Sequence, residues 1–509
     1  MPAFDVRDLL EAAGQTDRQS AGPTPPPVRA TETQDPGNAG RGGPISPAVL
    51  ADCVRAGEFL LILTLGMAVR HLSPACLAPL SFRQFAAASG VAILAVGLFQ
   101  AVGAYRIDAV RSPCTGLRLA LAWTTTVIVV GTGLVLAEAD DPCSRAWLAQ
   151  LFGLGLGLLL AGRFAVVRLV RVRMRHGRFD RRTAIVGGGA VAEDLIRALD
   201  AQTESGIRIV GVFDDRGDRR SDTVVAGYPK LGTVDDLVAY ARTTRLDLVI
   251  FTIPIAAEDR ILQMLAKLWV LPIDIRLSAQ ASKLRLRPRA YSYLGTVPVL
   301  DVFDKPMADW DIIVKSVFDR LVGLAMLVVL SPVMLAVAAA VALTSPGPVL
   351  FRQKRYGFNN ELIEVYKFRS MYHDQADFAA ARQVTRGDPR VTPVGRFIRR
   401  TSLDELPQLF NVIKGELSLV GPRPHALQGH VSNTLYDQVV DGYFARHKVK
   451  PGITGWAQVN GWRGETDTSD KIQRRVEHDL YYIENWSILF DIRIMLATPV
   501  SMVQTKNAY

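Results

Sequence analysis

Adjacent carboxylates beside paired arginines are the residues best suited to chemistry in this 509-residue chain. They lie in the run Arg399-Arg400-Thr401-Ser402-Leu403-Asp404-Glu405-Leu406-Pro407. A nearby guanidinium lowers the pKa of a carboxyl group and keeps it ionised, as a nucleophile or a magnesium ligand must be. The run also fits a helix start, because Ser402 and Glu405 have capping-box spacing and Pro407 suits a first turn. Both interpretations of Asp404 and Glu405 stay open at this point.

Three further motifs suit the binding of phosphates or sugars. The cations of Lys367-Phe368-Arg369 follow a strand-like segment, so both should point to one side of it. In Gly421-Pro422-Arg423-Pro424, two prolines fix the backbone around one arginine and orient its fork for a phosphate. Residues 450–463, KPGITGWAQVNGWR, are too rich in Gly and Pro for a helix and predict a binding loop. Solvated or packed segments are the alternative in each case.

A glycine-rich turn predicts a second candidate site. Gly187-Gly188-Gly189-Ala190-Val191-Ala192 fits G-x-G-x-x-A between a strand and a helix. The next strand ends at Asp214, roughly where a ribose-binding acid is expected. Gly187, Gly189 and Asp214 are therefore candidate nucleotide-binding residues. The alternative is that the glycines serve only the tight turn and close helix packing.

The elements around this turn predict a Rossmann-like α/β domain over residues 180–300. Short buried strands such as TAIVGGGA and DLVIFTIP alternate with helical stretches near 190–201, 233–244 and 257–269. Such alternation indicates βαβ units and a parallel sheet.

The composition predicts a membrane protein. The chain is 49% hydrophobic and only 21% charged, with a mean hydropathy of +0.17. These values exclude an ordinary cytosolic enzyme, a disordered chain and a small disulfide scaffold. Residues 1–47 are rich in Pro and Gly and predict a disordered tail that is no signal peptide.

A four-helix transmembrane bundle is predicted over residues 48–175. Each of its apolar segments has about the length needed to cross a bilayer, roughly 20 residues. The segments lie near 50–70, 85–105, 117–137 and 147–170. A soluble bundle of buried helices is the alternative. Basic residues from Arg163 to Arg182 follow the last segment, so we expect both ends of the bundle to face the cytoplasm. The net charge of +10 suits anionic partners. Among these we expect membrane lipid and phosphates, and no nucleic acid.

A fifth apolar segment, residues 312–343, follows a connector at 301–311 and is interrupted by Ser331-Pro332. A simple fifth span would place residues 344–509 outside the cell, away from any nucleotide pool. A kinked, re-entrant helix that enters and leaves by one face resolves this conflict. Ser331 could satisfy the backbone that Pro332 disrupts. An ordinary kinked span is the alternative.

Together, five collinear motifs over residues 310–509 resemble the polyprenyl-phosphate hexose-1-phosphate transferases, the bacterial monotopic phosphoglycosyl transferases. They cover about two-fifths of the chain. The bundle and the Rossmann-like domain look like the long form of that family, in which the sugar is often glucose and the product serves exopolysaccharide synthesis. The motifs are LSPVMLAVAAAVALTSPGPVLFRQKRYG, EVYKFRSM, RRTSLDELPQLFNVIKGELSLVGPRP, HKVKPGITGWAQVNGWRG and YYIENWSILFDI.

The resemblance implies a small α/β catalytic domain at 344–509, on the cytoplasmic face of the bacterial inner membrane. It implies that Asp404 attacks the β-phosphate of a UDP-sugar, releases UMP and passes the phosphosugar to undecaprenyl phosphate. It further implies Mg²⁺ as cofactor, with Asp404 and Glu405 as ligands, and a re-entrant helix at Ser331-Pro332. The residues that match the family's substrate positions are Lys367, Arg369, Arg399, Arg423, Arg463 and Asp491.

Several alternatives stay open. Galactose is a second choice for the hexose, and a homodimer is plausible. An NAD-dependent sugar-nucleotide dehydratase or epimerase would explain the Rossmann-like domain, but no Tyr has a Lys four positions on, as such enzymes need. A non-catalytic scaffold for polysaccharide export would leave the charged motifs unexplained.

The cysteines permit one further hypothesis. Cys76 and Cys143 fall in the two predicted external connections, on the oxidising side of the membrane. They could pair if their Cα atoms approach within about 7 Å. Two unpaired thiols are the alternative.

Overall fold

The computed structural model divides the chain into two compact units, which are described separately. One unit spans Gly40–Asp180 and the other includes Arg181–Tyr509. The structure describes residues 46–72, 82–105, 115–136, 142–175, 180–202, 206–216, 223–254, 257–279, 292–294, 297–307, 309–373, 388–426, 430–431, 434–435, 443–462 and 468–504.

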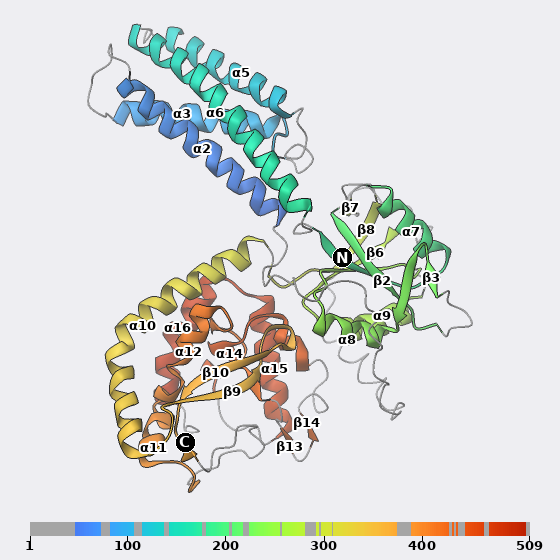
Figure 1. The fold of residues 1–509 in the computed structure, drawn as a ribbon, viewed down its shortest axis with the longest axis vertical. Coiled ribbons are helices and arrows are strands. Elements are labelled where there is room, and N and C mark those ends of the chain that lie inside the picture. Colours follow the sequence, from blue (N-terminus) through green and yellow to red (C-terminus); the bar gives the residue numbers. More distant parts are fainter. Residues whose placement is uncertain are drawn as a thin grey trace. The chain divides into compact units, whose positions relative to one another are not determined.

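The first unit is a bundle of four helices. They are α2 (Pro47–Leu72), α3 (Phe82–Ala101), α5 (Thr115–Leu136) and α6 (Pro142–Arg175). The helices pack side by side in Figure 1 around buried residues that include Phe99, Trp123 and Leu151. The Trp147 indole donates to the Gly66 carbonyl at 2.8 Å, which ties α6 to α2.

Four helices in the described part of the chain are long and apolar enough to cross a membrane. Three belong to this bundle, α3, α5 and α6, and the fourth is α10 (Trp310–Thr344) of the second unit. The predicted length and apolar character are therefore confirmed for α3, α5 and α6, whereas α2 is not among these helices. That helix carries the charged residues Asp52, Arg55 and Glu58. One of these charges is paired within the bundle, because Arg163 of α6 lies 2.9 Å from Glu58.

One half of the cysteine hypothesis lies within the described residues. Cys143 is disulfide-bonded, whereas Cys53 is free and exposed. Cys76 lies outside the described residues, so its pairing with Cys143 stays a prediction.

The α/β domain of the second unit has a mostly parallel sheet, as the sequence predicts. Its strand order is β3-β4-β2-β1-β5-β6-β8-β7, and β4, β2, β1, β5 and β6 run parallel. The edge strands β3 and β7, and β8 next to β7, pair antiparallel and were not predicted. The strands are β1 (Arg181–Val186), β2 (Ile207–Phe213), β3 (Val224–Val225), β4 (Tyr228–Gly232), β5 (Leu248–Phe251), β6 (Asp274–Ser278), β7 (Ser292–Leu294) and β8 (Val297–Phe303).

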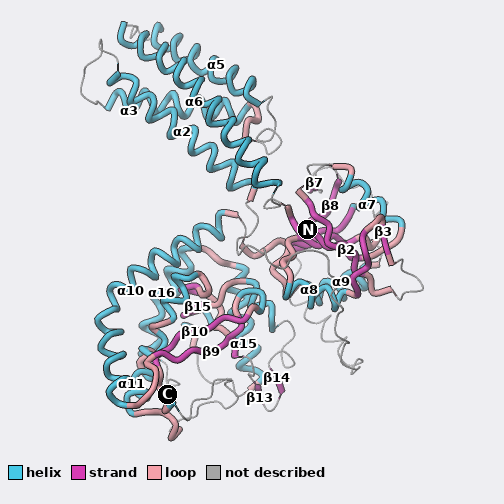
Figure 2. The backbone as a smooth tube through the Cα atoms, viewed as in Figure 1, coloured by secondary structure: helices cyan, strands magenta, loops and turns pink. Residues whose placement is uncertain are grey.

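Helices cover both faces of this sheet. α7 (Ala190–Asp200) packs on one face, and α8 (Val234–Thr243) and α9 (Glu258–Leu268) pack on the other. Figure 2 shows the magenta strands with α8 and α9 together beside them. Two apolar cores therefore hold a doubly covered sheet, which is typical of parallel strands.

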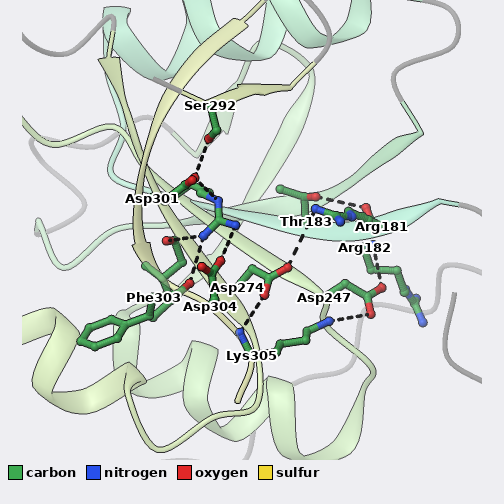
Figure 3. A network of polar contacts seen from close by, with 12 residues as sticks. Arg181, Arg182, Thr183, Asp247, Asp274, Ser292, Asp301, Phe303, Asp304 and Lys305 are labelled. Atoms are coloured by element: carbon green, nitrogen blue, oxygen red, sulfur yellow. Dashed lines mark hydrogen bonds and ion pairs between the residues drawn. The ribbon is translucent and has the colours of Figure 1, made fainter. Parts of the chain in front are cut away.

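An ionic network joins the amino-terminal edge of the sheet to the segment that leads toward α10. Lys305 donates its backbone N–H to Asp274 at 3.0 Å, and its ammonium lies 3.7 Å from Asp247. Arg276 pairs with both Asp301 and Asp304 at 2.6 Å. Figure 3 shows the side chains of Asp247, Asp274, Asp301 and Asp304 with these two cations. The predicted connector at 301–311 therefore begins with the last residues of β8, and the ionic network holds the residues that follow.

The C-terminal domain is built on short strands and several helices. Its strands form three small sheets, β10-β9-β12, β11-β15 and β13-β14. The strands are β9 (Leu350–Tyr356), β10 (Leu362–Phe368), β11 (Ser418–Val420), β12 (His425–Ala426), β13 (His430–Val431), β14 (Thr434–Leu435) and β15 (Gly452–Thr454). The helices are α11 (Pro393–Arg400), α12 (Gln408–Lys414), α14 (Trp456–Val459), α15 (Ser469–Glu484) and α16 (Ile488–Gln504), with 3-10 turns η5 (Phe358–Asn360), η7 (Leu403–Glu405) and η8 (Tyr443–Lys448).

Helix α10 runs along the outside of this domain as one bent, 35-residue helix (Figure 1). Pro332 lies inside it and offers no N–H to the carbonyl of Val328, four residues earlier. The Ser331 hydroxyl donates to that carbonyl instead, at 2.8 Å. The predicted role of Ser331 is therefore confirmed, whereas the re-entrant course of α10 stays a prediction.

Candidate active site

Three segments far apart in the sequence meet at Glu405. Lys367 at the end of β10 donates its ammonium to Glu405 Oε1 at 2.8 Å. Arg423, in the loop after β11, donates Nη2 to the same oxygen at 2.6 Å and Nη1 to Oε2 at 3.3 Å. Burial alone would raise the pKa of Glu405, but Arg423 and Lys367 outweigh it and hold the pKa well below its ordinary range. Glu405 is therefore ionised and bonded to two cations.

Asp404 is placed quite differently from its neighbour. Its carboxylate is only partly exposed and has no hydrogen bond or ion pair among the described residues. Burial raises the pKa of Asp404 to about 6, against the opposing charge of Lys367. An ionised carboxylate without a hydrogen bond keeps its lone pairs for a metal ion or an electrophile.

The backbone before Asp404 excludes the capping-box interpretation. Ser402 has φ +57°, in the left-handed region, and makes no capping hydrogen bond to the turn that follows. The residue thus breaks the chain direction between α11 and η7, and a non-glycine residue in this region is strained. Strain of this kind is common where side chains must be aimed at a site.

Close backbone contacts set the Gly421-Pro422-Arg423-Pro424 loop against the segment at 450–463. A Cβ on Gly421 would lie 2.5 Å from the Lys450 carbonyl, and one on Gly455 would lie 2.3 Å from the Gly421 carbonyl. These glycines permit β11 and β15 to pair, which fixes the loop that carries Arg423. The segment also contains the one-turn helix α14, so the prediction of a pure loop was too simple.

Lys367 and Arg369 do not share a partner, although the sequence predicted a common side. β10 ends at Phe368, so the alternation that relates the two cations stops before Arg369. Arg369 is buried and donates Nη2 to the Ser345 carbonyl at 2.6 Å and Nη1 to the Pro346 carbonyl at 2.9 Å. In this structure it holds the end of α10.

Asp491 also lies in a separate network. It is fully buried in α16 and accepts from Lys315 at 2.7 Å, Tyr482 at 2.8 Å and Trp486 at 3.2 Å. Lys315 belongs to α10, so this network ties the membrane helix to the C-terminal domain. The predicted substrate roles of Arg369 and Asp491 remain untested predictions.

The other predicted residues fall in three places. Arg399 lies in the last turn of α11, and its charge lowers the pKa of Asp404, so it belongs with the cluster. Arg463 lies outside the described residues. At the second candidate site Asp214 accepts from Arg216 Nε at 2.8 Å, and Gly187 and Gly189 have φ of +99° and +85°. The turn therefore requires these glycines, while nucleotide binding stays a prediction.

The cationic cluster extends to three arginines that the sequence motifs did not indicate. Arg446 in η8 donates to the Arg423 carbonyl at 2.9 Å and pairs with Asp479 of α15 at 2.6 Å. Arg355 in β9 donates to the Pro424 carbonyl at 3.4 Å. Arg475 lies one turn before Asp479 on α15. They come from three separate elements, so no spacing in the sequence could have grouped them with Glu405.

The donor set fits Mg²⁺ only in part. No group of three or more His, Cys, Asp or Glu side chains lies together among the described residues. Magnesium often takes one or two protein carboxylates and completes its shell with water and substrate phosphates. Asp404 has oxygens free for that purpose, whereas those of Glu405 already accept from Lys367 and Arg423.

Two family models match the chain. Residues 310–505 match the model described as bacterial sugar transferase, and residues 100–279 match one described as CoA-binding domain.

Similar curated proteins span most of the chain. It is 37% identical over 428 residues to the UDP-glucose:undecaprenyl-phosphate glucose-1-phosphate transferase of Escherichia coli (strain K12), covering 82% of this chain and 89% of that protein. It is 42% identical over 333 residues to the undecaprenyl-phosphate glucose phosphotransferase of Komagataeibacter xylinus, covering 65% of this chain but 61% of that protein.

A third relative differs in its sugar. The chain is 42% identical over 186 residues to the UDP-N-acetylgalactosamine-undecaprenyl-phosphate N-acetylgalactosaminephosphotransferase of Aeromonas hydrophila, covering 36% of this chain and 42% of that protein.

Proposed function

Since the chain belongs to the polyprenyl-phosphate hexose-1-phosphate transferase family and is a phosphotransferase, we propose that it transfers glucose 1-phosphate from UDP-glucose to undecaprenyl phosphate. Glucose is favoured because the relatives that cover the largest share of the chain are named for glucose or UDP-glucose. The N-acetylgalactosamine relative aligns over a much shorter part.

The observation that carries the proposed mechanism is the contrast between Asp404 and Glu405. An Asp404 oxygen attacks the β-phosphorus, and the bond from that phosphorus to the bridging oxygen breaks. UMP leaves with the bridging oxygen, and an aspartyl-phosphosugar remains on the enzyme. An oxygen of undecaprenyl phosphate then attacks the same phosphorus and frees Asp404 as a carboxylate.

The cations around Asp404 have two tasks in this mechanism. Lys367 and Arg399 favour the ionised form of Asp404, which is the form that attacks. Lys367 and Arg423 also supply positive charge where the diphosphate must lie, and Glu405 fixes both side chains in place. Pre-oriented charges of this kind stabilise a transition state without reorganisation. Bound Mg²⁺, for which Asp404 is the better-suited protein ligand, would neutralise further charge on the diphosphate.

The proposal includes a location and a pathway step. The apolar helices anchor the enzyme in the bacterial inner membrane, with the C-terminal domain on the cytoplasmic face and α10 re-entering that face at its bend. The lipid-linked sugar is then the first membrane intermediate of exopolysaccharide synthesis. A homodimer stays a prediction.

An assay of UMP release tests the activity. Enzyme in lipid nanodiscs should release UMP from UDP-glucose only when undecaprenyl phosphate is present for repeated turnover. UDP-galactose and UDP-N-acetylgalactosamine in parallel reactions identify the preferred sugar. Denatured enzyme should retain label from UDP-[¹⁴C]glucose given without lipid. Absence of retained label, together with normal turnover, would rule out the covalent step.

A further inference from the structure

The C-terminal domain contains two arginines, Arg355 and Arg475, that form no hydrogen bond or ion pair with a carboxylate among the described residues. Arg475 donates to no described residue and pairs with none, and its Nε is buried. Arg355 donates only to neutral oxygens, those of the Gln353 side chain and the Pro424 carbonyl. Both side chains are only partly exposed, and the charges of Glu405 and Asp479 act on them without a direct contact. A largely desolvated guanidinium without a carboxylate bonded to it is costly, so proteins rarely keep one without a purpose.

Both arginines belong to the cluster that surrounds Glu405. The loop of Arg423 joins them, because the Pro424 carbonyl accepts from Arg355 and the Arg423 carbonyl accepts from Arg446. Burial and then the Arg423 charge lower the pKa of Arg355 to about 10. Burial and then the Arg446 charge lower the pKa of Arg475 to about 10. The cations repel one another, so an anion placed among them would be stabilised.

We propose that Arg475 and Arg355 form an anion subsite that adjoins the Asp404–Glu405 pair and binds the phosphate of the nucleotide that leaves. This inference rests on the proposed function, which places the other phosphate of the UDP-sugar at Asp404. Positive charge at the leaving phosphate also stabilises the charge that develops there as the bond to the β-phosphorus breaks.

The position of Arg475 favours the nucleotide over the lipid phosphate. α15, which carries Arg475, packs mainly on η8 and α14, whereas α10 packs mainly on α12, α11 and β11. In Figure 1, α10 borders one side of the C-terminal domain and α15 lies away from it. A lipid phosphate arrives beside the membrane helix, whereas a soluble nucleotide can arrive from the far side.

Direct binding of UMP and uridine to full-length enzyme in nanodiscs tests the subsite without turnover. Arg475→Met should weaken UMP binding about ten- to a hundredfold, the range expected for one charged hydrogen bond. Uridine binding should stay unchanged, because uridine lacks the phosphate. The melting temperature should not fall, because the variant removes an unpaired cation.

Arg474→Met is the matched control. Arg474 is the exposed neighbour on the same helix and pairs with Asp470 at 3.5 Å, so its variant removes the same charge outside the cluster. It should bind UMP as the wild type does. Arg475→Lys should recover part of the affinity, and Arg355→Met should weaken UMP binding in the same direction as Arg475→Met.

Three results would overturn the proposal. They are unchanged UMP affinity in Arg475→Met, an equal loss of uridine affinity, or a raised KM for undecaprenyl phosphate with normal UMP binding. The last result would assign the subsite to the lipid phosphate. Wild-type enzyme that binds UMP but never releases it from UDP-glucose would instead refute the proposed function, so the two failures are distinguishable.

Discussion

Asp214 in the α/β domain and Asp404 in the C-terminal domain both lie beside arginines, but only the carboxylate of Asp214 is bound by one. Arg216 occupies both oxygens of Asp214, with Nε 3.2 Å from Oδ1 and 2.8 Å from Oδ2. The carboxylate of Asp404 has no hydrogen bond among the described residues, although Lys367, Arg399 and Arg423 surround it. The charge of Asp214 is therefore neutralised by Arg216, whereas the carboxylate of Asp404 is left without a bonded partner among the described residues.

The contrast shows where in this molecule to look for chemistry. A satisfied ion pair stabilises a turn and has little capacity left for a ligand, whereas unsatisfied charges are retained at the expense of stability. The glycine-rich turn after β1 matches a known nucleotide-binding pattern, but pattern alone does not establish function. The open charges lie instead around Asp404, Arg355 and Arg475.

Replacing the two aspartates in parallel should give the largest difference between the two domains. Asp404→Asn should lower UMP release by at least about a thousandfold, because the amide keeps the shape but cannot attack phosphorus. Asp214→Asn should change it less than about twofold. Steady-state UMP release from both variants, with melting temperatures as a folding control, decides the matter. Comparable losses in both variants would contradict the distinction.

The arginine partners give the next largest effect. Arg423→Met should lower kcat/KM about a hundredfold, since it removes one positioned charge and leaves Glu405 with Lys367 as its remaining cationic partner. Arg216→Met, its counterpart in the α/β domain, should leave kcat/KM nearly unchanged. A large loss in Arg216→Met would show that the glycine-rich turn serves the reaction after all.

Arg369 and Lys367 belong to one motif, but only Lys367 contacts Glu405. The buried guanidinium of Arg369 is satisfied by the end of α10, so Arg369→Met should destabilise the protein by about 2–4 kcal/mol. The folded fraction should turn over within a few-fold of wild type. Arg352→Met, at an exposed position of β9, is the control and should have the melting temperature of the wild type. Thermal unfolding and activity per folded enzyme measure both quantities, and a fully stable but inactive Arg369→Met would restore its role at the substrate.

Lys448 offers the smallest and most pH-dependent effect. Burial lowers its pKa to about 8 in the folded protein, below the ordinary value near 10.4 in the unfolded chain. Between these values the unfolded state binds more protons, so stability rises with pH. The melting temperature of the wild type should therefore rise relative to Lys448→Met from pH 7 to pH 9.5. A constant difference between the two proteins would refute the shift.

The sequence predicted most of the elements because their signals are local. Alternating apolar strands and helices located β1, β2, β5 and β6, and long apolar runs located α3, α5, α6 and α10. It missed β7 and β8 because antiparallel strands need no crossover helix between them, so no helical pattern marks their position in the sequence. It treated α2 as a span because its apolar length outweighed Asp52, Arg55 and Glu58.

The candidate site was predictable only where its residues are consecutive. Asp404, Glu405, Lys367 and Arg423 lie in short motifs whose types indicate phosphate chemistry. Arg355, Arg446 and Arg475 come from three separate elements, and only the folded chain brings them together. Arg369 was given the same side as Lys367 because the length of β10 could not be read to the residue.

The hydrogen bond from Ser331 to the Val328 carbonyl constrains the order in which evolution could remove the bend in α10. If Ser331 mutates first, the Val328 carbonyl loses its donor on a helix face where Val328 itself is 65% exposed. In the membrane position proposed for α10, an unpaired carbonyl would cost several kcal/mol, which disfavours this order. If Pro332 mutates first, the new N–H can serve the carbonyl and Ser331 becomes dispensable. The proline can therefore be lost without the serine, whereas the serine is retained for as long as the proline remains.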